Sequence, residues 1–191
     1  MPLIGTFGAA SSRGFGYAGG GAKFVTATGG CVSTVGDFKV HVFNGPGTFC
    51  VSCAGNEDGS NTVDYLVVAG GGGAGFNNAG GGGGGGYRES PGAATGCYTV
   101  SPKAGGSALP VSIQGYPIDV GNGGSGSSGS QGGDGNDSVF STITSSGGGG
   151  GAKGEGSNSG RSGGSGGGGG YPGGSAGSGN SPPTSPSQGS N

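Results

Sequence analysis

VDYLVVAGGGG, residues 63–73, joins a short apolar run directly to a run of glycine. The residues before Gly70 favour extended backbone, and the end of this run is apolar on both faces, which predicts an interior β-strand over residues 63–69. Gly70 to Gly73 then provide backbone without side chains. The junction therefore predicts a fold in which β-strands lead straight into glycine segments.

The glycine content excludes an ordinary globular composition and collagen alike. Glycine makes up 59 of the 191 residues and proline 10, whereas collagen needs glycine at every third position and proline at about 15–20% or more. The unbroken run Gly81 to Gly86 also violates the collagen period. Intrinsic disorder is disfavoured because charged residues are 8% of the chain and the formal net charge is only −2.

Long glycine runs can be ordered when several of them pack together. In the extended threefold helix called polyglycine II, each residue advances about 3.1 Å and no hydrogen bond forms inside the helix. Every N–H and C=O group must therefore find a partner on a neighbouring helix. Glycine segments over residues 70–86, 121–135 and 147–179, joined by turns and strands, meet this condition. Flexible linkers are the alternative interpretation of each run.

Short strands are predicted in the remaining sequence. Residues 37–43 alternate, with Phe38, Val40 and Val42 on one face, and a turn signal at residues 44–47 leads to a second alternating stretch at residues 48–53. Together they predict a β-hairpin. Further strands are predicted at residues 97–100, at 111–120 with a kink at Gly115, and at 138–144. The predicted fold class is mostly β with extended polyglycine-II helices, short hairpins and sheet followed by a packed glycine-helix bundle, and essentially no α-helix.

The chain divides into four predicted segments. Residues 1–36 form an N-terminal attachment segment with isolated aromatic residues, and residues 37–69 form the β-hairpin region. Residues 70–180 form the glycine-rich strand and polyglycine-II region. Residues 181–191 are rich in Ser and Pro, which predicts a flexible tail.

Nucleic-acid binding and membrane insertion are both disfavoured. The net charge of −2 provides no field that would favour polyphosphate, and the arginine–glycine segment Arg13 to Tyr17 stands alone. No stretch reaches the roughly 18 consecutive apolar residues of a membrane span. The N-terminus lacks the positive charge and strong apolar region of a secretory signal, so synthesis in a cytoplasm is expected.

Catalytic and redox sites are not expected either. Cys50 and Cys53 form a C-x-x-C pair, but a strand would place their thiols on opposite faces, where they could not share a metal. His41 is the only histidine. It lies mid-strand with Asp37 four residues away, which puts the two on no common face for a catalytic triad. We expect no enzyme activity and no catalytic residues.

One stretch fits a calcium-binding repeat. Residues 132–140 match the nonapeptide G-G-x-G-x-D-x-U-x, with Asp137 as the residue to test. Calcium in such proteins is shared between successive turns of a repeated coil, and this chain has a single copy. The sequence therefore predicts a turn that leads into the next strand, with no metal and no cofactor.

The strand-to-glycine junction at residues 63–73 is similar to junctions in glycine-rich virion proteins of tailed bacteriophages, especially cyanophages and other marine phages. Three further features share the resemblance: the glycine run that ends in Gly86-Tyr87-Arg88-Glu89, the strand 138–144 before Gly147–Gly151, and the hairpin segment 44–49. The chain also resembles the distal adhesins of T-even-like phages, in which packed polyglycine-II helices form a sandwich whose loops recognise receptors. This resemblance implies a tail-fibre or adhesin component of the virion that contacts the host surface.

The resemblance also implies where binding would occur, namely in the loops between glycine helices. These loops are Phe76-Asn77-Asn78, residues 153–161 and Tyr171-Pro172, whose aromatic and amide groups could stack on sugars or grip protein loops. Simple turns are the alternative reading of each loop. The implied partners are other virion subunits and a host receptor, either a glycan or an outer-membrane protein, and a homo-oligomer is left open. Two other functions compete: a decoration or connector protein of the virion, and an extracellular glycine-rich fibre protein.

Overall fold

The computed structural model describes residues 21–92, 101–156 and 158–191. These residues form strands and no helix, so the mostly-β prediction is confirmed, and the described ranges contain no helix that could cross a membrane. The strands are β1 (Val25–Thr28), β2 (Cys31–Val35), β3 (Phe38–Val42), β4 (Gly47–Ala54), β5 (Thr62–Val63), β6 (Leu66–Val68), β7 (Tyr87–Glu89), β8 (Leu109–Pro110), β9 (Gly115–Asp119), β10 (Ser138–Phe140) and β11 (Ile143–Ser145).

The strands form one larger sheet and several small pairs, which we call the β part. The larger sheet has the antiparallel order β1-β4-β9-β10-β11, and the pairs are β2–β3, β5–β8 and β6–β7. Its core follows from alternation along β4, where Phe49 and Val51 are buried while their neighbours Cys50 and Ser52 are exposed. The Phe140 ring meets Phe49 edge to face at a centroid distance of 6.0 Å. Such pairs add about 0.5–1.5 kcal/mol to the burial of their apolar surface.

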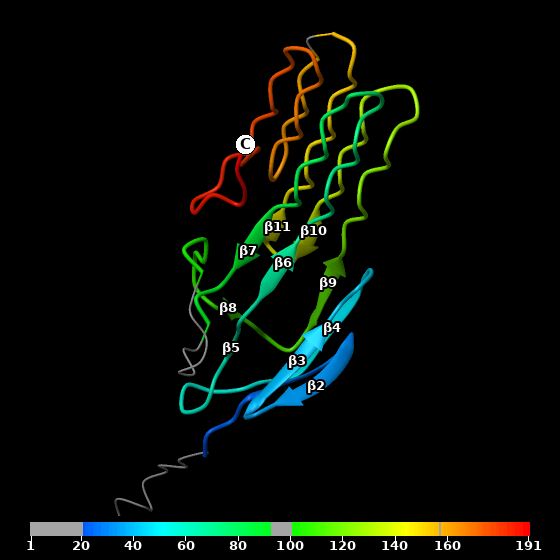
Figure 1. The fold of residues 1–191 in the computed structure, drawn as a ribbon. Helices are drawn as coiled ribbons and strands as arrows, with labels where there is room; N and C mark the ends of the chain where they lie inside the picture. Colours follow the sequence, from blue (N-terminus) through cyan, green and yellow to red (C-terminus); the bar gives the residue numbers. More distant parts are fainter. Residues whose placement is uncertain (1–20, 93–100, 157) are drawn as a thin grey trace, which may run out of the picture.

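Several strands continue without interruption into glycine segments. β6 leads into residues 69–76, β9 into 121–127 and β11 into 146–155, while residues 80–86 lead into β7 and residues 130–137 into β10. Further segments at residues 158–164, 165–171 and 174–181 complete the set. Figure 1 shows these glycine segments side by side, forming an elongated rod that extends from the β part. The sequence junction at residues 63–73 is one of several such transitions.

Hydrogen bonds between the glycine segments recur at every third residue. Ala69, Gly72 and Gly75 donate their N–H groups to the carbonyl oxygens of Gly86, Gly83 and Gly80, at 3.0, 2.8 and 3.1 Å. The next residues along, Gly70, Gly73 and Phe76, donate instead to Asn136, Gly133 and Ser130. A flat β-strand would donate hydrogen bonds to the same neighbour at every second residue. The backbone of a glycine segment therefore turns about its own axis and bonds to neighbours in several directions.

Residues 146–152 form the centre of the rod, and all of them are buried. Their backbone exchanges hydrogen bonds with segments 69–76, 80–86, 130–136, 158–164 and 165–171. A Cβ atom added at Gly149, Gly150 or Gly151 would overlap a carbonyl oxygen of a neighbouring segment. Close backbone packing thus explains why glycine dominates this segment.

The predicted hairpin of residues 37–43 with 48–53 is wrong in its pairing. β3 pairs with β2, so that Val35 lies opposite Phe38 across a turn in which Gly36 has φ 56°. β4 pairs instead with β1 and β9. Gly36 tolerates the left-handed backbone that this tight turn requires. The predicted segment boundary at residue 36 falls inside the β2–β3 hairpin.

Three single strands expected from the sequence begin or end elsewhere. The stretch 63–69 is divided between β5 and β6, and β6 buries Val67 but exposes Leu66 and Val68, so the interior strand was a wrong expectation. The stretch 138–144 is the β10–β11 hairpin, which turns at Ser141 with φ 55°. The stretch 111–120 yields a strand only from Gly115, the expected kink. The strand expected at residues 97–100 lies outside the described residues.

The C-terminal segment packs on the rod, in contrast to the flexible tail expected from its composition. Gln188 is 1% exposed, and its Oε1 accepts the Ser146 N–H at 2.9 Å. Its Nε2 donates to Ser146 Oγ and to the carbonyl oxygen of Pro182. One buried amide side chain therefore satisfies backbone groups that a glycine segment would otherwise have to satisfy.

Candidate functional site

The loops at the far end of the rod gather the residues that the sequence singled out. Gly154 donates its N–H to Phe76 O at 2.9 Å, and Glu155 donates to Tyr171 O at 2.9 Å. Tyr171 in turn donates to Asn78 O at 3.0 Å. Loops far apart in the sequence thus meet at one place, the end opposite the β part in Figure 1. We call residues 76–79, 127–131, 153–156, 158–159 and 171–173 the tip.

The turn at Phe76-Asn77-Asn78 has a clear local cause. Asn77 and Asn78 have φ 52° and 48°, two successive left-handed residues, and asparagine tolerates this conformation better than most residues. The Asn77 side chain also donates a hydrogen bond from Nδ2 to Glu155 Oε1. Glu155 has φ 64°. These residues hold two tip loops together, so each has a structural task whatever else it does.

Two aromatic side chains of the tip face solvent. Tyr171 is 71% exposed and Phe76 is 40% exposed. The peptide bond between Tyr171 and Pro172 is cis. Phe76 and Tyr171 both form backbone hydrogen bonds to other tip loops, and these bonds hold the backbone atoms that carry the two rings. The tip therefore presents aromatic surface on a braced backbone.

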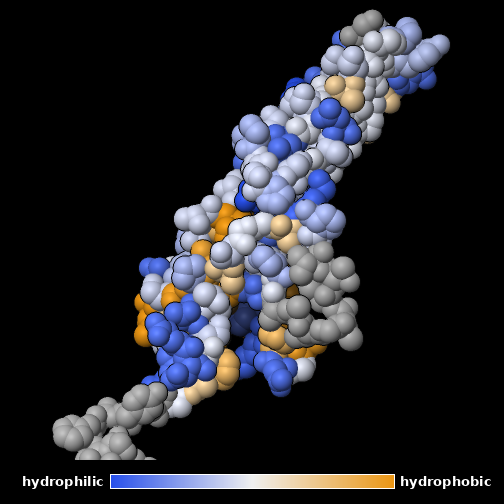
Figure 2. Space-filling view, turned by 90° about the vertical axis from the view of Figure 1, so that its left-hand side faces the viewer, coloured by the Kyte–Doolittle hydropathy of each residue, from blue (hydrophilic) through white to orange (hydrophobic). Residues whose placement is uncertain are grey.

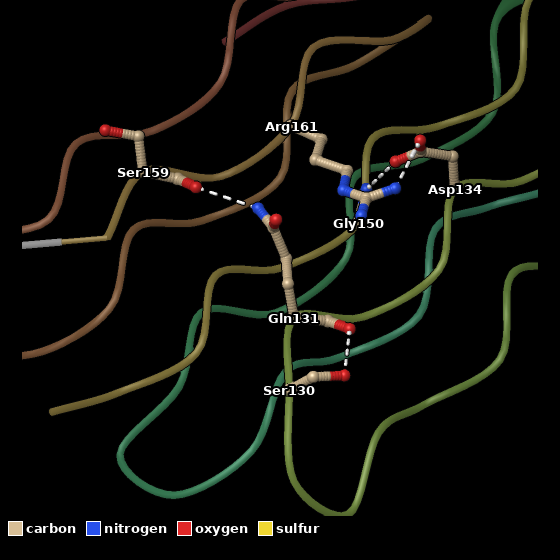
Figure 3. Close-up of polar contacts among 6 residues, drawn as sticks. All are labelled: Ser130, Gln131, Asp134, Gly150, Ser159 and Arg161. Carbon is tan, nitrogen blue, oxygen red and sulfur yellow. Dashed lines mark hydrogen bonds and ion pairs between the residues drawn. The ribbon is translucent and has the colours of Figure 1, made fainter.

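A row of side chains closes one side of the central segment, between residues 130–137 and 158–163. Two N–H groups of the central segment, those of Gly147 and Gly150, donate to carboxylates at 2.8 and 2.7 Å, the first to Asp137 and the second to Asp134. Asp134 also pairs with Arg161 at 3.0 Å, as Figure 3 shows. We call this row the side-chain seam. The two N–H groups that donate to these carboxylates lie three residues apart on the central segment. Within residues 147–152, the other N–H groups donate to carbonyl oxygens of glycine segments.

The seam ends at the tip in a polar hollow. The Gln131 side chain reaches across and donates from Nε2 to Ser159 O at 2.9 Å (Figure 3). Beside it lies a cavity of about 270 Å³ lined by Gly129, Ser130, Gln131, Lys153, Asn158 and Ser159. We call this cavity the tip pocket. Its lining residues include serines, Gln131, Asn158 and Lys153, a composition that suits a polar ligand.

In the structure, the two carboxylates of the calcium-like motif accept hydrogen bonds from backbone N–H groups. Asp137 accepts the Gly147 N–H and Asp134 accepts the Gly150 N–H, so both carboxylates serve the seam. Among the described residues, no three His, Cys, Asp or Glu side chains gather as a metal site. Residues 138–140 form β10, the expected strand, but the expected turn is wrong, because residues 131–137 are an extended glycine segment of the rod.

The other residues weighed as reactive lie in the β part. Cys50 and Cys53 are free thiols on β4. The His41 ring meets the Phe49 ring at 5.1 Å, and its Nδ1 lies 2.8 Å from Gly29 O. The pKa of Tyr87 is raised by its hydrogen bond to Glu89, and the pKa of Tyr116 is lowered by its hydrogen bonds with Ser112. These groups stand apart from the tip.

Sequence reasoning missed part of the tip. Residues 121–135 read as one glycine segment, whereas the structure turns back at Ser127 to Ser130, where the Ser130 N–H donates to Ser127 Oγ at 2.8 Å. The cluster Ser127-Ser128-Gly129-Ser130 is a turn signal of the usual kind. It would have predicted this loop and, beside it, Gln131.

One protein family matches the chain. The family described as a glycine-rich domain matches residues 44–191, a range that starts just before β4 and includes the rod, the seam and the tip. Comparisons with curated proteins and with solved structures give no match.

Proposed function

Since the chain belongs to the glycine-rich domain family, we propose that it is a structural protein of a bacteriophage virion, a tail-fibre or adhesin component that binds the host cell surface through its tip. The proposal joins three features: a stiff rod, a tip of exposed loops and an apolar face at the opposite end. The observation that carries it is the convergence of the three aromatic and amide loops on one end of the rod. A set of loops at the end of a long rod suits contact with a distant surface.

We further propose that the glycine segments are polyglycine-II helices. The three-residue hydrogen-bond period between segments supports this, because the threefold helix turns by one third per residue. The central segment supports it as well. Gly148 and Gly151 donate to segment 69–76, and Gly149 and Ala152 donate to segment 165–171. The remaining donors, Gly147 and Gly150, point to the seam. Donors thus leave the segment in three directions that repeat every third residue.

The rod favours recognition by its tip for an energetic reason. Loops that are already braced lose less conformational freedom on binding, so a few aromatic and amide groups can provide useful affinity. Phe76, Asn77, Asn78, Tyr171 and Pro172 are the proposed receptor contacts. Figure 2 supports the division of tasks, since the rod surface is mostly hydrophilic while apolar surface gathers over the β part.

The β2–β3 hairpin is the proposed contact with other virion subunits. Its inner face carries His41, which packs on Phe49. Its outer face carries Val35, Phe38, Val40 and Val42, which are 62%, 47%, 39% and 43% exposed. An apolar sheet face of this kind usually lies against a partner. The same face favours the second candidate function, a connector or decoration protein that never touches the host.

Adsorption of phage particles tests the proposal. The tip variant combines Phe76→Ser, Asn77→Gly, Asn78→Gly and Tyr171→Ser, in which glycine keeps the left-handed turn. We expect particles that assemble but no longer adsorb to host cells. Ile113→Ser, which changes a 69% exposed residue of the β part, is the control and should adsorb normally. Normal adsorption of the tip variant would support the connector function instead, and absence of the protein from particles would leave the extracellular fibre.

A further inference from the structure

We infer that the tip pocket binds an anionic sugar, that is, a sugar unit carrying a carboxylate or a phosphate. This inference rests on the proposed function and names the receptor chemistry that the tip would recognise. It depends on the charge, the fixed amides and the size of the pocket, and on the aromatic residue beside it.

The charge argument concerns Lys153, a half-buried residue of the pocket wall. The nearby acids have other partners: Asp134 pairs with Arg161 at 3.0 Å, and Glu155, which keeps its negative charge, accepts a hydrogen bond from the Asn77 amide. Within the described part of the chain, the Lys153 ammonium forms no ion pair. A cation that forms no ion pair in the wall of a concave site favours an anionic ligand.

The amide argument concerns Gln131 and Asn158. Gln131 Nε2 donates to Ser159 O at 2.9 Å, and Asn158 Nδ2 donates to Lys153 O at 3.3 Å. Each side chain is therefore held through its nitrogen, which leaves its amide oxygen as an acceptor for hydroxyl groups. Together with the Ser159 hydroxyl, these groups offer the mixture of donors and acceptors that a sugar ring requires.

The backbone of Phe76 runs beside the pocket wall. Its N–H donates to Ser130 O at 3.1 Å, and its carbonyl accepts the Gly154 N–H at 2.9 Å. The Phe76 backbone is thus held between Ser130 and Gly154, the residues adjacent to Gln131 and Lys153. An exposed aromatic side chain on a backbone held in this way can provide apolar surface for a sugar face. The volume of about 270 Å³ is near the lower end of small-molecule sites, about 300 Å³, and so suits a single sugar unit.

Nuclear magnetic resonance titration of the ¹⁵N-labelled full chain tests the inference. The probes are glucuronate, glucose 6-phosphate, neutral glucose and inorganic phosphate. We expect a charged sugar to shift the amide signals of Gly129, Gln131 and Asn158. The affinity obtained from these shifts should be at least about tenfold higher than the affinity for glucose or inorganic phosphate. A response to glucuronate alone assigns a carboxylated sugar, and a response to glucose 6-phosphate alone assigns a phosphorylated one. Equal binding of glucose, equal binding of inorganic phosphate, or no shift at these residues would overturn the inference.

Charge variants separate this inference from the proposed function. Lys153→Gln should weaken binding of the charged sugar about tenfold or more, whereas Lys39→Gln, on the exposed β3 strand, should leave it unchanged. Equal affinities of the Lys153→Gln protein and the unchanged protein would refute the role of Lys153. If the charged sugars fail to bind but the tip variant still abolishes adsorption, the proposed function stands and the ligand class is wrong. If the charged sugars bind while the tip variant adsorbs normally, the pocket stands and host attachment falls.

Discussion

Replacing Gly83 with alanine should disrupt the rod, while the same change at Gly81 should not. Both residues belong to segment 80–86, so the two variants share chemistry, length and surroundings along the chain. A Cβ at Gly83 would lie 2.6 Å from Gly166 O and closer still to Ser165 O, where ordinary contacts begin at 3.4 Å. A Cβ at Gly81 would meet nothing within 4 Å. The difference is therefore one of packing alone.

The expected cost at Gly83 follows from what must move. Segments 80–86 and 165–171 would have to separate to make room for the added methyl group. Overpacking of this kind costs about 1–3 kcal/mol. Gly83 also donates to Gly149 O and accepts from Gly72, both at 2.8 Å. Strain on these two hydrogen bonds adds about 0.5–1.5 kcal/mol each. The total is about 2–6 kcal/mol, whereas Gly81→Ala should stabilise the protein by about 0.4–1 kcal/mol, because alanine restricts the unfolded chain.

Thermal and urea unfolding followed by circular dichroism measure both variants. For a chain of this size each kcal/mol corresponds to about 2–4 °C in Tm, so Gly83→Ala should lose on the order of 10 °C. Gly81→Ala should melt at or slightly above the temperature of the unchanged protein. Equal Tm values for the two variants, whether both lowered or both unaltered, would refute the packing of segment 80–86 described above.

Further outcomes concern the seam, the C-terminal segment and calcium, and all are measured as unfolding free energies or Tm. Asp134→Ala should cost about 1–3 kcal/mol because it strands the buried Gly150 N–H, whereas Arg161→Ala should cost less than about 1 kcal/mol, since the ion pair is 47% and 45% exposed; a reversed order would contradict the seam. Gln188→Ala should cost about 2–4 kcal/mol through three lost hydrogen bonds, two of them buried, and an unaffected Tm would mean that the C-terminal segment does not pack on the rod. Removing calcium with a chelator should leave Tm unchanged, and a drop that Asp137→Ala abolishes would restore the calcium interpretation of residues 132–140.

The sequence predicted the positions of strands better than it predicted which strands pair. Alternation in residues 38–42 identified a strand, because burial on one face imposes a period of two. It could not show that β3 pairs with β2, since the pairing depends on a turn at Gly36 and on where the chain leads after residue 44. Likewise, residues 138–144 had the composition of one strand. The left-handed turn at Ser141 lies at a residue type that gives no strong turn signal.

The candidate site was predictable as a set of loops but not as one place. Phe76-Asn77-Asn78 and Tyr171-Pro172 interrupt glycine runs, and such interruptions mark turns. Their convergence at the tip depends on the lengths of glycine segments that run in opposite directions, which only the three-dimensional packing fixes. The flexible tail was expected from Ser and Pro content. Composition could not reveal that Gln188 fits beside Ser146.

Amide hydrogen exchange, resolved residue by residue, tests most directly the central claim that the glycine runs form an ordered rod. In the central segment, the N–H groups of residues 147–152 all donate within the protein, so all should exchange slowly. In segment 80–86, Gly80, Gly83 and Gly86 donate to Ala152, Gly149 and Ser146. Gly81 and Gly84 donate to no group among the described residues. The account predicts slow exchange at Gly80, Gly83 and Gly86 with faster exchange between them. Uniformly fast exchange at random-coil rates, or protection at every second residue, would contradict it.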